Sequence, residues 1–309
     1  MPSASEISSV SEAAELLRRA TKEGGRVSIG REGGEVVLST SRLDRVLEHE
    51  AADLTCIVEA GVRVRDLNEQ LAGHGQMLAL DPPGNPTIGA CLAANLSGPR
   101  RHRYGTARDL VIGVTVVLGD GTVASSGGKV VKNVAGYDLA KLFCGSRGRF
   151  GLIARVALRL HPRPEAARTL AAPVDSPEDA AAKARAILRS PVEASAVDVV
   201  WPDALTVLIE GSRRAVDEQL AVAQAAVGGG EDAGSIWEEA AARQERAEGR
   251  LLFAPGELAT TLRGLDEAVV RVSAGVAYVP DAGPDERDPA ELALVERVRA
   301  QLDPAGVLV

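Results

Sequence analysis

The segment PTIGACLAANLSGPRRHRYG, residues 86–105, has the composition of a loop in which a phosphate group can approach the backbone. The longer segment 81–105 that contains it is rich in Pro, Gly and Ala, and its apolar residues follow no clear period. Backbone N–H groups bind phosphate best where no side chain blocks the approach, and Thr87, Asn95 and Ser97 would add side-chain donors. A turn-rich connection between core elements has the same composition, so the segment alone leaves both interpretations open. It is neither a G-x-G-x-x-G motif nor a P-loop.

The flanking segments predict helices and strands. Upstream, Ser9-x-x-Glu12 is a capping-box pattern that opens a helix, and Gly24-Gly25 ends that helix. Downstream, the Asp120-Gly121 pair between two apolar runs predicts a β-hairpin, and the alternation in residues 151–160 predicts a half-buried strand. The remaining patterns of this half predict strands at 26–29, 35–39 and 53–62, and short helices at 41–50, 63–75 and 139–143.

The best domain boundary is His161-Pro162-Arg163-Pro164, because two prolines in four residues break both helix and sheet. We expect a first domain of residues 1–163, with subdomains at about 1–55 and 56–163, and a second domain of residues 164–309. The second domain is Ala-rich and alternates strand and helix patterns, which predicts a small α+β unit. Two domains suit a chain of 309 residues.

The composition excludes several classes of function. A net charge of −8 argues against binding along a nucleic-acid backbone, which needs a dense Lys/Arg surface. The three cysteines are odd in number and widely spaced, as in a reduced, cytoplasmic protein. The N-terminus lacks the pattern of a signal peptide, and no window approaches 18 consecutive apolar residues. We therefore expect any membrane contact to come through a partner.

Taken together, the segments resemble one family in their order and spacing. The first segment is followed by DLVIGVTVVLGDGTV, then by GGKVVKNVAGYDLAKLFCGS, and then by GRFGLIARVALRLHPRP. This series resembles the FAD-binding domain of the vanillyl-alcohol oxidase / p-cresol methylhydroxylase (PCMH) class, and within that class the FAD-binding accessory subunits of bacterial glycolate oxidases. The resemblance covers about residues 10–165, whereas the C-terminal half matches in size and layout.

The resemblance implies a fold, a cofactor and a set of site residues. The fold would be α+β: a two-subdomain PCMH-type FAD-binding fold followed by a small α+β, ferredoxin-like C-terminal domain. FAD would lie extended between the subdomains, bound non-covalently. The backbone N–H groups implied to hold its pyrophosphate are those of Thr87, Ile88, Gly89 and Ala90. The residues implied to lie near the flavin are Asn95, Ser97, Gly98, Tyr104 and Gly105. The last strand would present the backbone of Gly151 and Ile153, positioned by Gly136 and Asp138 as turn and cap residues.

The first glycine-rich loop departs from the family pattern. Relatives carry a loop of the type Arg-Gly-Gly-Gly-Thr, whereas this chain has Gly30-Arg31-Glu32-Gly33-Gly34-Glu35. Glu32 and Glu35 would stand where an anionic pyrophosphate approaches, and like charges repel. Arg31 could offset that repulsion. This loop is the feature that favours a chain that has kept the fold and lost the cofactor.

The substrate side offers few candidates. Relatives that oxidise D-lactate or glycolate carry His-rich segments in a large C-terminal cap, whereas all four histidines here lie at or before His161. We identify neither a catalytic residue nor a metal ligand set. His102 is the histidine of most interest because it lies between the loop and Tyr104. Cys91 could in principle link a flavin covalently, but a small buried residue is the simpler role.

Arg100, Arg101 and Arg103 form a basic cluster in an acidic protein. The cluster could be a solvated loop. It could equally neutralise FAD phosphates, a substrate carboxylate or an acidic partner.

The sequence-based hypothesis is an FAD-dependent oxidoreductase subunit of a glycolate oxidase-type 2-hydroxy-acid dehydrogenase complex. Its expected partners are a second flavoprotein, an iron-sulfur subunit and a small 2-hydroxy acid. Two alternatives stay open: a non-catalytic assembly subunit that has lost FAD, and an independent FAD-dependent alcohol or sugar oxidase.

Overall fold

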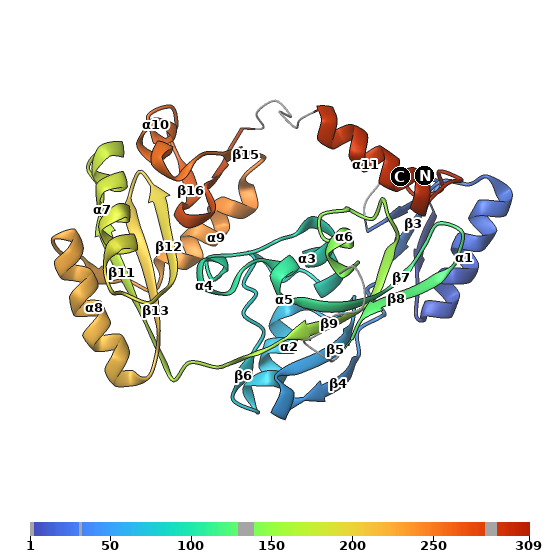
Figure 1. The fold of residues 1–309 in the computed structure, drawn as a ribbon, viewed down its shortest axis with the longest axis horizontal. Helices are drawn as coiled ribbons and strands as arrows, with labels where there is room; N and C mark the ends of the chain where they lie inside the picture. Colours follow the sequence, from blue (N-terminus) through green and yellow to red (C-terminus); the bar gives the residue numbers. More distant parts are fainter. Residues whose placement is uncertain (1–2, 31–32, 129–138, 282–288) are drawn as a thin grey trace.

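The computed structural model describes residues 3–30, 33–128, 139–281 and 289–309. Two bodies lie side by side (Figure 1), and within these ranges no sheet is shared between them. The buried side chains of residues 7–160 form clusters separate from those of residues 166–279. On this basis we propose a division of the chain into two domains near residue 163.

A small parallel sheet opens the first domain, in the order β1-β3-β2. Its elements are β1 (Ser3–Glu6), α1 (Val10–Glu23), β2 (Val27–Ile29) and β3 (Val36–Ser39). The predicted α1 is confirmed: the Ser9 hydroxyl accepts from the Glu12 amide, and Gly24 ends the helix at a φ of 69°. In a capping box the Glu12 carboxylate would accept from the amide of the N-cap, Ser9. Here it accepts from the amide and hydroxyl of Ser8, the residue before the N-cap.

The larger part of the first domain is a five-stranded sheet in the order β4-β5-β9-β7-β8. Its strands are β4 (Val46–Glu50), β5 (Thr55–Glu59), β7 (Val111–Val117), β8 (Val123–Gly127) and β9 (Leu152–Arg159). The other elements are η1 (Ala51–Asp53), α2 (Val64–Ala72), β6 (Gln76–Met77), α3 (Ile88–Ala94), α4 (Arg101–Tyr104), α5 (Ala107–Leu110), α6 (Ala140–Phe143) and β10 (His161–Pro162). The predicted hairpin is confirmed, because β7 and β8 pair antiparallel.

Three sequence-based predictions need correction here. Residues 41–50, expected to be a helix, contain β4, because pairing with β5 satisfies their backbone groups at the sheet edge. The strand expected to be half-buried, β9, lies between β5 and β7 and is buried on both faces. Residues 86–105, which show no period, contain the short helices α3 and α4.

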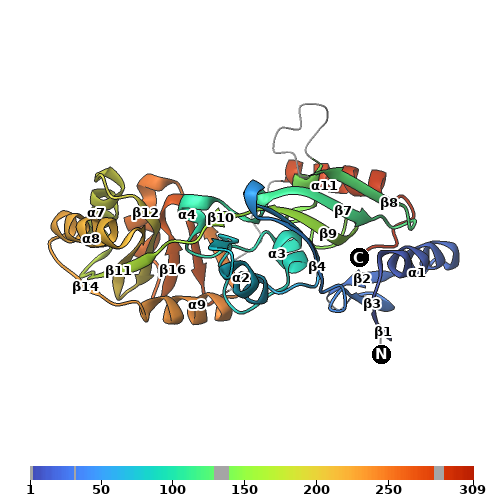
Figure 2. The same cartoon turned by 90° about the horizontal axis from the view of Figure 1, so that it is seen from below.

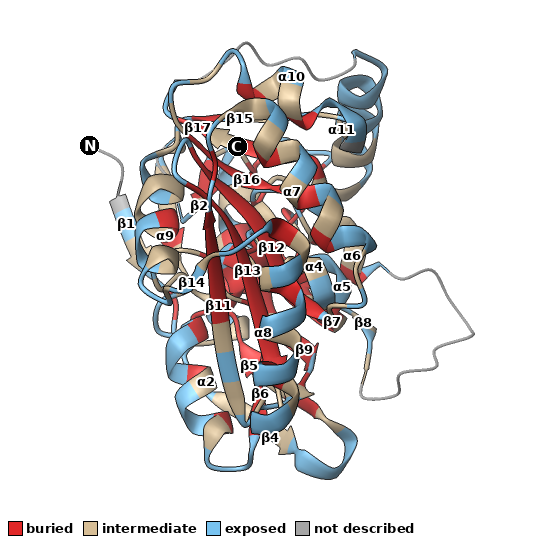
Figure 3. Cartoon of the chain, turned by 90° about the vertical axis from the view of Figure 1, so that its left-hand side faces the viewer, coloured by how far each residue is buried: buried red, intermediate tan, exposed pale blue. Residues whose placement is uncertain are grey.

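The second domain is a seven-stranded antiparallel sheet in the order β14-β11-β13-β12-β16-β17-β15. Its strands are β11 (Ala166–Pro173), β12 (Ala194–Trp201), β13 (Ala204–Gly211), β14 (Glu231–Asp232), β15 (Gly249–Leu252), β16 (Ala268–Arg271) and β17 (Val276–Val279). Its helices are α7 (Pro177–Arg189), α8 (Arg213–Val227), α9 (Ile236–Arg246), η2 (Pro255–Glu257), α10 (Leu258–Leu262) and η3 (Val272–Ala274). Helices α7 and α8 cover one face and α9 the other (Figure 2). The central strands are therefore buried on both sides (Figure 3).

The chain then returns to the first domain, and we propose that residues 289–309 belong to that domain and not to the second. Helix α11 (Pro289–Leu302) packs Val295 and Val298 against the core of the first domain. Beyond it, the Val27 amide donates to the Val307 carbonyl at 2.8 Å, and the Val309 amide donates to the Val27 carbonyl at 3.0 Å. The apolar end of the chain is thus buried against β2, a pairing partner that no local pattern reveals.

This return predicts a measurable contribution to stability. Leu308 is fully buried, so Leu308→Ala should lower the free energy of unfolding by about 2–3 kcal/mol. Leu294→Ala is the matched control, since that side chain is 55% exposed. Urea denaturation would compare the two, and equal effects would contradict the docking of the C-terminus.

Candidate functional site

The segment expected to hold pyrophosphate begins helix α3. The Thr87 hydroxyl accepts from the Ala90 amide at 3.2 Å and caps the helix. The Ile88 amide donates to the Val62 carbonyl at 2.8 Å, and the Gly89 amide to the Ala60 carbonyl at 2.7 Å. The N–H groups of Ile88, Gly89 and Ala90 are therefore already bonded within the chain. A phosphate would have to displace those acceptors, so these amides are not a ready-made cradle.

Two serine hydroxyls beside the carboxyl end of α3 are better placed to receive a ligand. Ser97 is 2% exposed and Ser146 is 3% exposed, and neither hydroxyl has a hydrogen-bond partner among the described residues. The segment around Ser146 is fixed to α3, because the Gly145 amide donates to the Leu92 carbonyl at 2.9 Å. A buried polar group without a partner costs free energy, and a bound polar molecule would remove that cost.

Of the other expected flavin neighbours, Asn95 caps α3, whereas Tyr104 and Gly105 lie at the end of α4. Asn95 ends the helix in the left-handed region at a φ of 48°, and its side-chain oxygen accepts from the Arg108 amide. The ring of Tyr104 lies 4.7 Å from that of His161, centroid to centroid. Gly105 has a φ of 83° and contacts Asp109 closely enough that a side chain would not fit.

Gly151 and Ile153 occupy the start of β9. Gly151 has a φ of 154°, and a Cβ there would lie 3.0 Å from the Val117 carbonyl oxygen. Ile153 is buried in the core of the first domain. Gly136 and Asp138 lie outside the described residues, as do Arg31 and Glu32 of the first loop.

Two other residues considered from the sequence have structural roles. Cys91 is fully buried in α3, and burial raises the pKa of its thiol to about 12, so it stays protonated and packs as a small apolar group. His102 binds the Ser273 hydroxyl through Nδ1 at 2.8 Å, and burial lowers its pKa.

The arginine cluster faces acidic residues of the second domain. The Arg100 guanidinium binds both carboxylate oxygens of Glu210, at 2.6 and 3.2 Å. Arg103 lies 3.9 Å from the Glu193 carboxylate, and the charge of Arg101 favours ionised Asp198. Among the roles that the sequence left open for the arginine cluster, these contacts support binding to acidic residues. Those acidic residues belong to the second domain of the same chain.

A second set of buried polar residues lies beside this cluster. Asp198 of β12 and Arg271 of β16 form an ion pair in which each side chain is 2% exposed. Arg271 also donates to the side-chain oxygen of Gln244, whose amide nitrogen donates to the Ser97 carbonyl at 3.4 Å. The carboxylate of Asp81 accepts from the Arg100 amide at 3.2 Å. Side chains of the second domain therefore reach the backbone of the loop that carries Ser97.

Sequence reasoning missed Asp81, Gln244, Glu210 and Arg271. A usable signal was present for one pair, because Asp198 and Arg271 are lone charges of opposite sign inside the apolar runs SAVDVVW and AVVRV. No such signal marks Asp81 or Gln244, which have ordinary polar surroundings in the sequence.

The pKa of Asp81 gives a prediction about pH. Burial raises it to about 7, and this outweighs the charges of Arg100 and Arg271 that lower it. Between about pH 4 and 7 the folded chain therefore holds a proton that the unfolded chain has lost, so the free energy of unfolding should fall as pH rises. One fifth of the side chain stays in water, so the expected fall is roughly 2 kcal/mol.

Asp81→Asn should remove this slope. The measurement is urea denaturation of both proteins from about pH 4 to 8. A variant whose pH profile runs parallel to that of the wild type would show that Asp81 titrates at its ordinary pKa.

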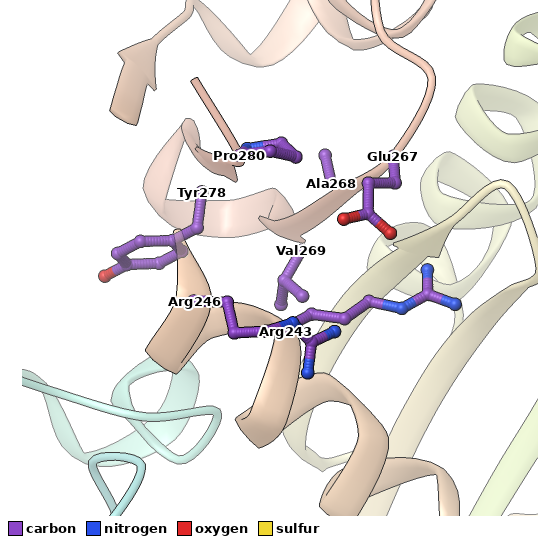
Figure 4. A pocket seen from close by; sticks show the side chains of 7 residues that line it. All are labelled: Arg243, Arg246, Glu267, Ala268, Val269, Tyr278 and Pro280. Carbon is purple, nitrogen blue, oxygen red and sulfur yellow. The ribbon is translucent and has the colours of Figure 1, made fainter. Parts of the chain in front are cut away.

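Two cavities in the described part of the chain are lined by residues other than Ser97 and Ser146. One, on the second domain between α9, β16 and β17 (Figure 4), has a volume of about 20 Å³, which suits about one water molecule. The other, of about 300 Å³, lies beside α2 and the link between the domains and is lined by Arg65, Arg100 and Arg163. Within the described residues, no group of His, Cys, Asp or Glu side chains is arranged to hold a metal ion, and no helix is long and apolar enough to cross a membrane.

Comparison with known proteins identifies the first domain. Residues 5–127 match the FAD binding domain family, which makes FAD the cofactor of this domain. The chain is 33% identical over 169 residues to mitochondrial D-lactate dehydrogenase [cytochrome] 1 of Saccharomyces cerevisiae, covering 54% of this chain and 29% of that protein. It is 39% identical over 143 residues to glycolate oxidase subunit GlcD of Bacillus subtilis, covering 46% and 30%. It is 31% identical over 197 residues to glycolate oxidase subunit GlcE of Escherichia coli, covering 63% and 55%.

The fold extends beyond the region of sequence similarity. An alkyldihydroxyacetonephosphate synthase structure aligns with a TM-score of 0.73 at 15% identity, over 98% of this chain and 75% of that one. This agreement confirms the α+β, PCMH-type fold. The matched regions span about a third of the D-lactate dehydrogenase and GlcD, and about half of GlcE.

Proposed function

Because residues 5–127 form an FAD-binding domain related to those of D-lactate dehydrogenases and glycolate oxidase subunits, we propose that this chain is an FAD-binding oxidoreductase subunit of a glycolate oxidase-type complex. The observation that carries the proposal is the match of this domain to the FAD binding domain family. The hydroxyls of Ser97 and Ser146 are buried near one end of α3 and have no hydrogen-bond partner in the described part of the chain, which supports the proposal.

The residues present fit the cofactor in part. Ser97 and Ser146 would donate to its polar groups. Bound FAD would supply the redox chemistry of this subunit. The chain's own contribution would be to bind and orient the cofactor and to exclude water from it.

We further propose an accessory role beside a substrate-oxidising flavoprotein and an iron-sulfur subunit. The second domain contains no histidine, whereas the hydroxy-acid-oxidising relatives are expected to use a His-rich cap. Here the second domain uses its polar groups to hold the first, through Glu210, Ser273 and Gln244. The similarity to GlcE, itself named as a glycolate oxidase subunit, supports this assignment.

The test is a cofactor measurement on the purified chain. We expect a yellow protein that releases one FAD per chain on heating, and copurification from native extract with partner subunits. A chain that stays colourless in excess FAD would contradict FAD binding. A chain that alone oxidises glycolate or D-lactate at ordinary enzymatic rates would contradict the accessory role.

One observation favours a second candidate, a non-catalytic assembly subunit. The amides of Ile88, Gly89 and Ala90 already have acceptors, which is the state expected of a loop with no phosphate to bind. This candidate predicts a colourless chain that still copurifies with partners, so the same two measurements separate it from the first.

A further inference from the structure

The loop that carries Ser97 is held at two points by side chains of the second domain. The guanidinium of Arg100 forms a two-pronged ion pair with Glu210, whose side chain is 1% exposed. Three residues earlier, the Ser97 carbonyl accepts from Gln244. Both partners are themselves fixed, Glu210 in β13 and Gln244 by its bond to the buried Arg271.

The first domain supports the same loop from the other side. The backbone of Gly98 lies against the Asp81 carbonyl, and the Asp81 carboxylate accepts from the Arg100 amide. The loop from Ser97 to Arg100 is therefore clamped between two domains. The hydroxyl of Ser97, which the clamp orients, is buried and has no partner among the described residues.

We propose that Gln244 and Glu210 are positioning residues through which the second domain fixes the Ser97–Arg100 loop, so that the Ser97 hydroxyl is presented to the flavin cofactor. This inference rests on the proposed function. The affinity of the chain for FAD and the electronic environment of the flavin would then depend on the second domain, even if that domain makes no contact with the flavin.

Gln244→Glu separates positioning from folding. The new carboxylate can still accept from Arg271, but it cannot donate to the Ser97 carbonyl and would repel it. Gln224→Glu is the matched control, because the half-buried Gln224 amide donates to the Gly230 carbonyl at 3.0 Å, inside the second domain. Each variant loses one hydrogen bond from its side chain to a loop carbonyl. In Gln244→Glu that carbonyl belongs to the first domain, whereas in Gln224→Glu it belongs to the second.

The experiment titrates each apoprotein with FAD, records the visible spectrum of the bound flavin, and follows amide hydrogen exchange of residues 97–101 without FAD. Gln244→Glu should weaken FAD binding about tenfold, shift the flavin spectrum and speed exchange in the loop, while Gln224→Glu changes none of the three. Glu210→Gln should act in the same direction as Gln244→Glu.

The possible results distinguish the positioning role of Gln244 from the proposed function of the chain. Equal affinity and spectra for wild type and Gln244→Glu, or equal losses in Gln244→Glu and its control, would overturn the positioning role. A wild-type chain that binds no FAD would overturn the proposed function and the cofactor part of this inference. In that case the exchange data still report separately whether Gln244 holds the loop.

Discussion

Gly98→Ala is expected to lower the free energy of unfolding by about 3 kcal/mol and to prevent FAD binding. A Cβ at this position would lie 1.7 Å from the Asp81 carbonyl oxygen and 2.5 Å from its carbon, far inside any contact distance. Asp81 cannot simply move away, because its carboxylate accepts from the Arg100 amide and Arg100 is paired with Glu210. One methyl group should therefore disturb the whole contact between the domains at this loop.

Gly264→Ala is the matched control, because a Cβ there would meet no atom within 4 Å. Urea denaturation and an FAD titration of both variants provide the comparison. If Gly98→Ala matched Gly264→Ala in stability and FAD affinity, the close approach of Gly98 to Asp81 would be wrong.

Arg271→Met should destabilise the chain by about 3–5 kcal/mol near neutral pH. The substitution leaves Asp198 buried without its counter-charge, and desolvation of a lone carboxylate is costly. Burial already raises the pKa of Asp198 against the opposing charge of Arg271, so losing that charge raises it further. The folded variant will then hold a proton that the unfolded chain releases, and its deficit should shrink as pH falls.

Two further variants test this interpretation. Adding Asp198→Leu to Arg271→Met should recover most of the loss, because removing both charges leaves no unpaired buried group. Arg263→Met breaks an ion pair with Glu178 in which both side chains are more than half exposed, and should cost less than about 1 kcal/mol. A double variant as unstable as Arg271→Met alone would place the damage in packing.

Much of the local structure followed from short-range patterns. The helix from Ser9 to Gly24 and the hairpin at Asp120-Gly121 are set by caps and turn residues, which act over a few positions. Helix α3 was missed because it is only seven residues long and mostly made of small residues, so the helical spacing of Ile88, Cys91 and Leu92 is too short to stand out. Strand β4 was misread because its helical spacing is overridden by pairing with β5.

The order of the motifs along the chain was enough to predict the FAD-binding fold and its cofactor. Each motif can be recognised on its own because it supplies a helix cap, a tight turn or a small side chain, which are requirements of neighbouring residues. The hydrogen bonds of the α3 amides depend on the packing of distant segments, since the acceptors of Ile88 and Gly89 are the carbonyls of Val62 and Ala60. The same packing brings the arginine cluster to Glu210 and the C-terminus to β2. Contacts between residues so far apart depend on how the elements pack, and no local pattern encodes them.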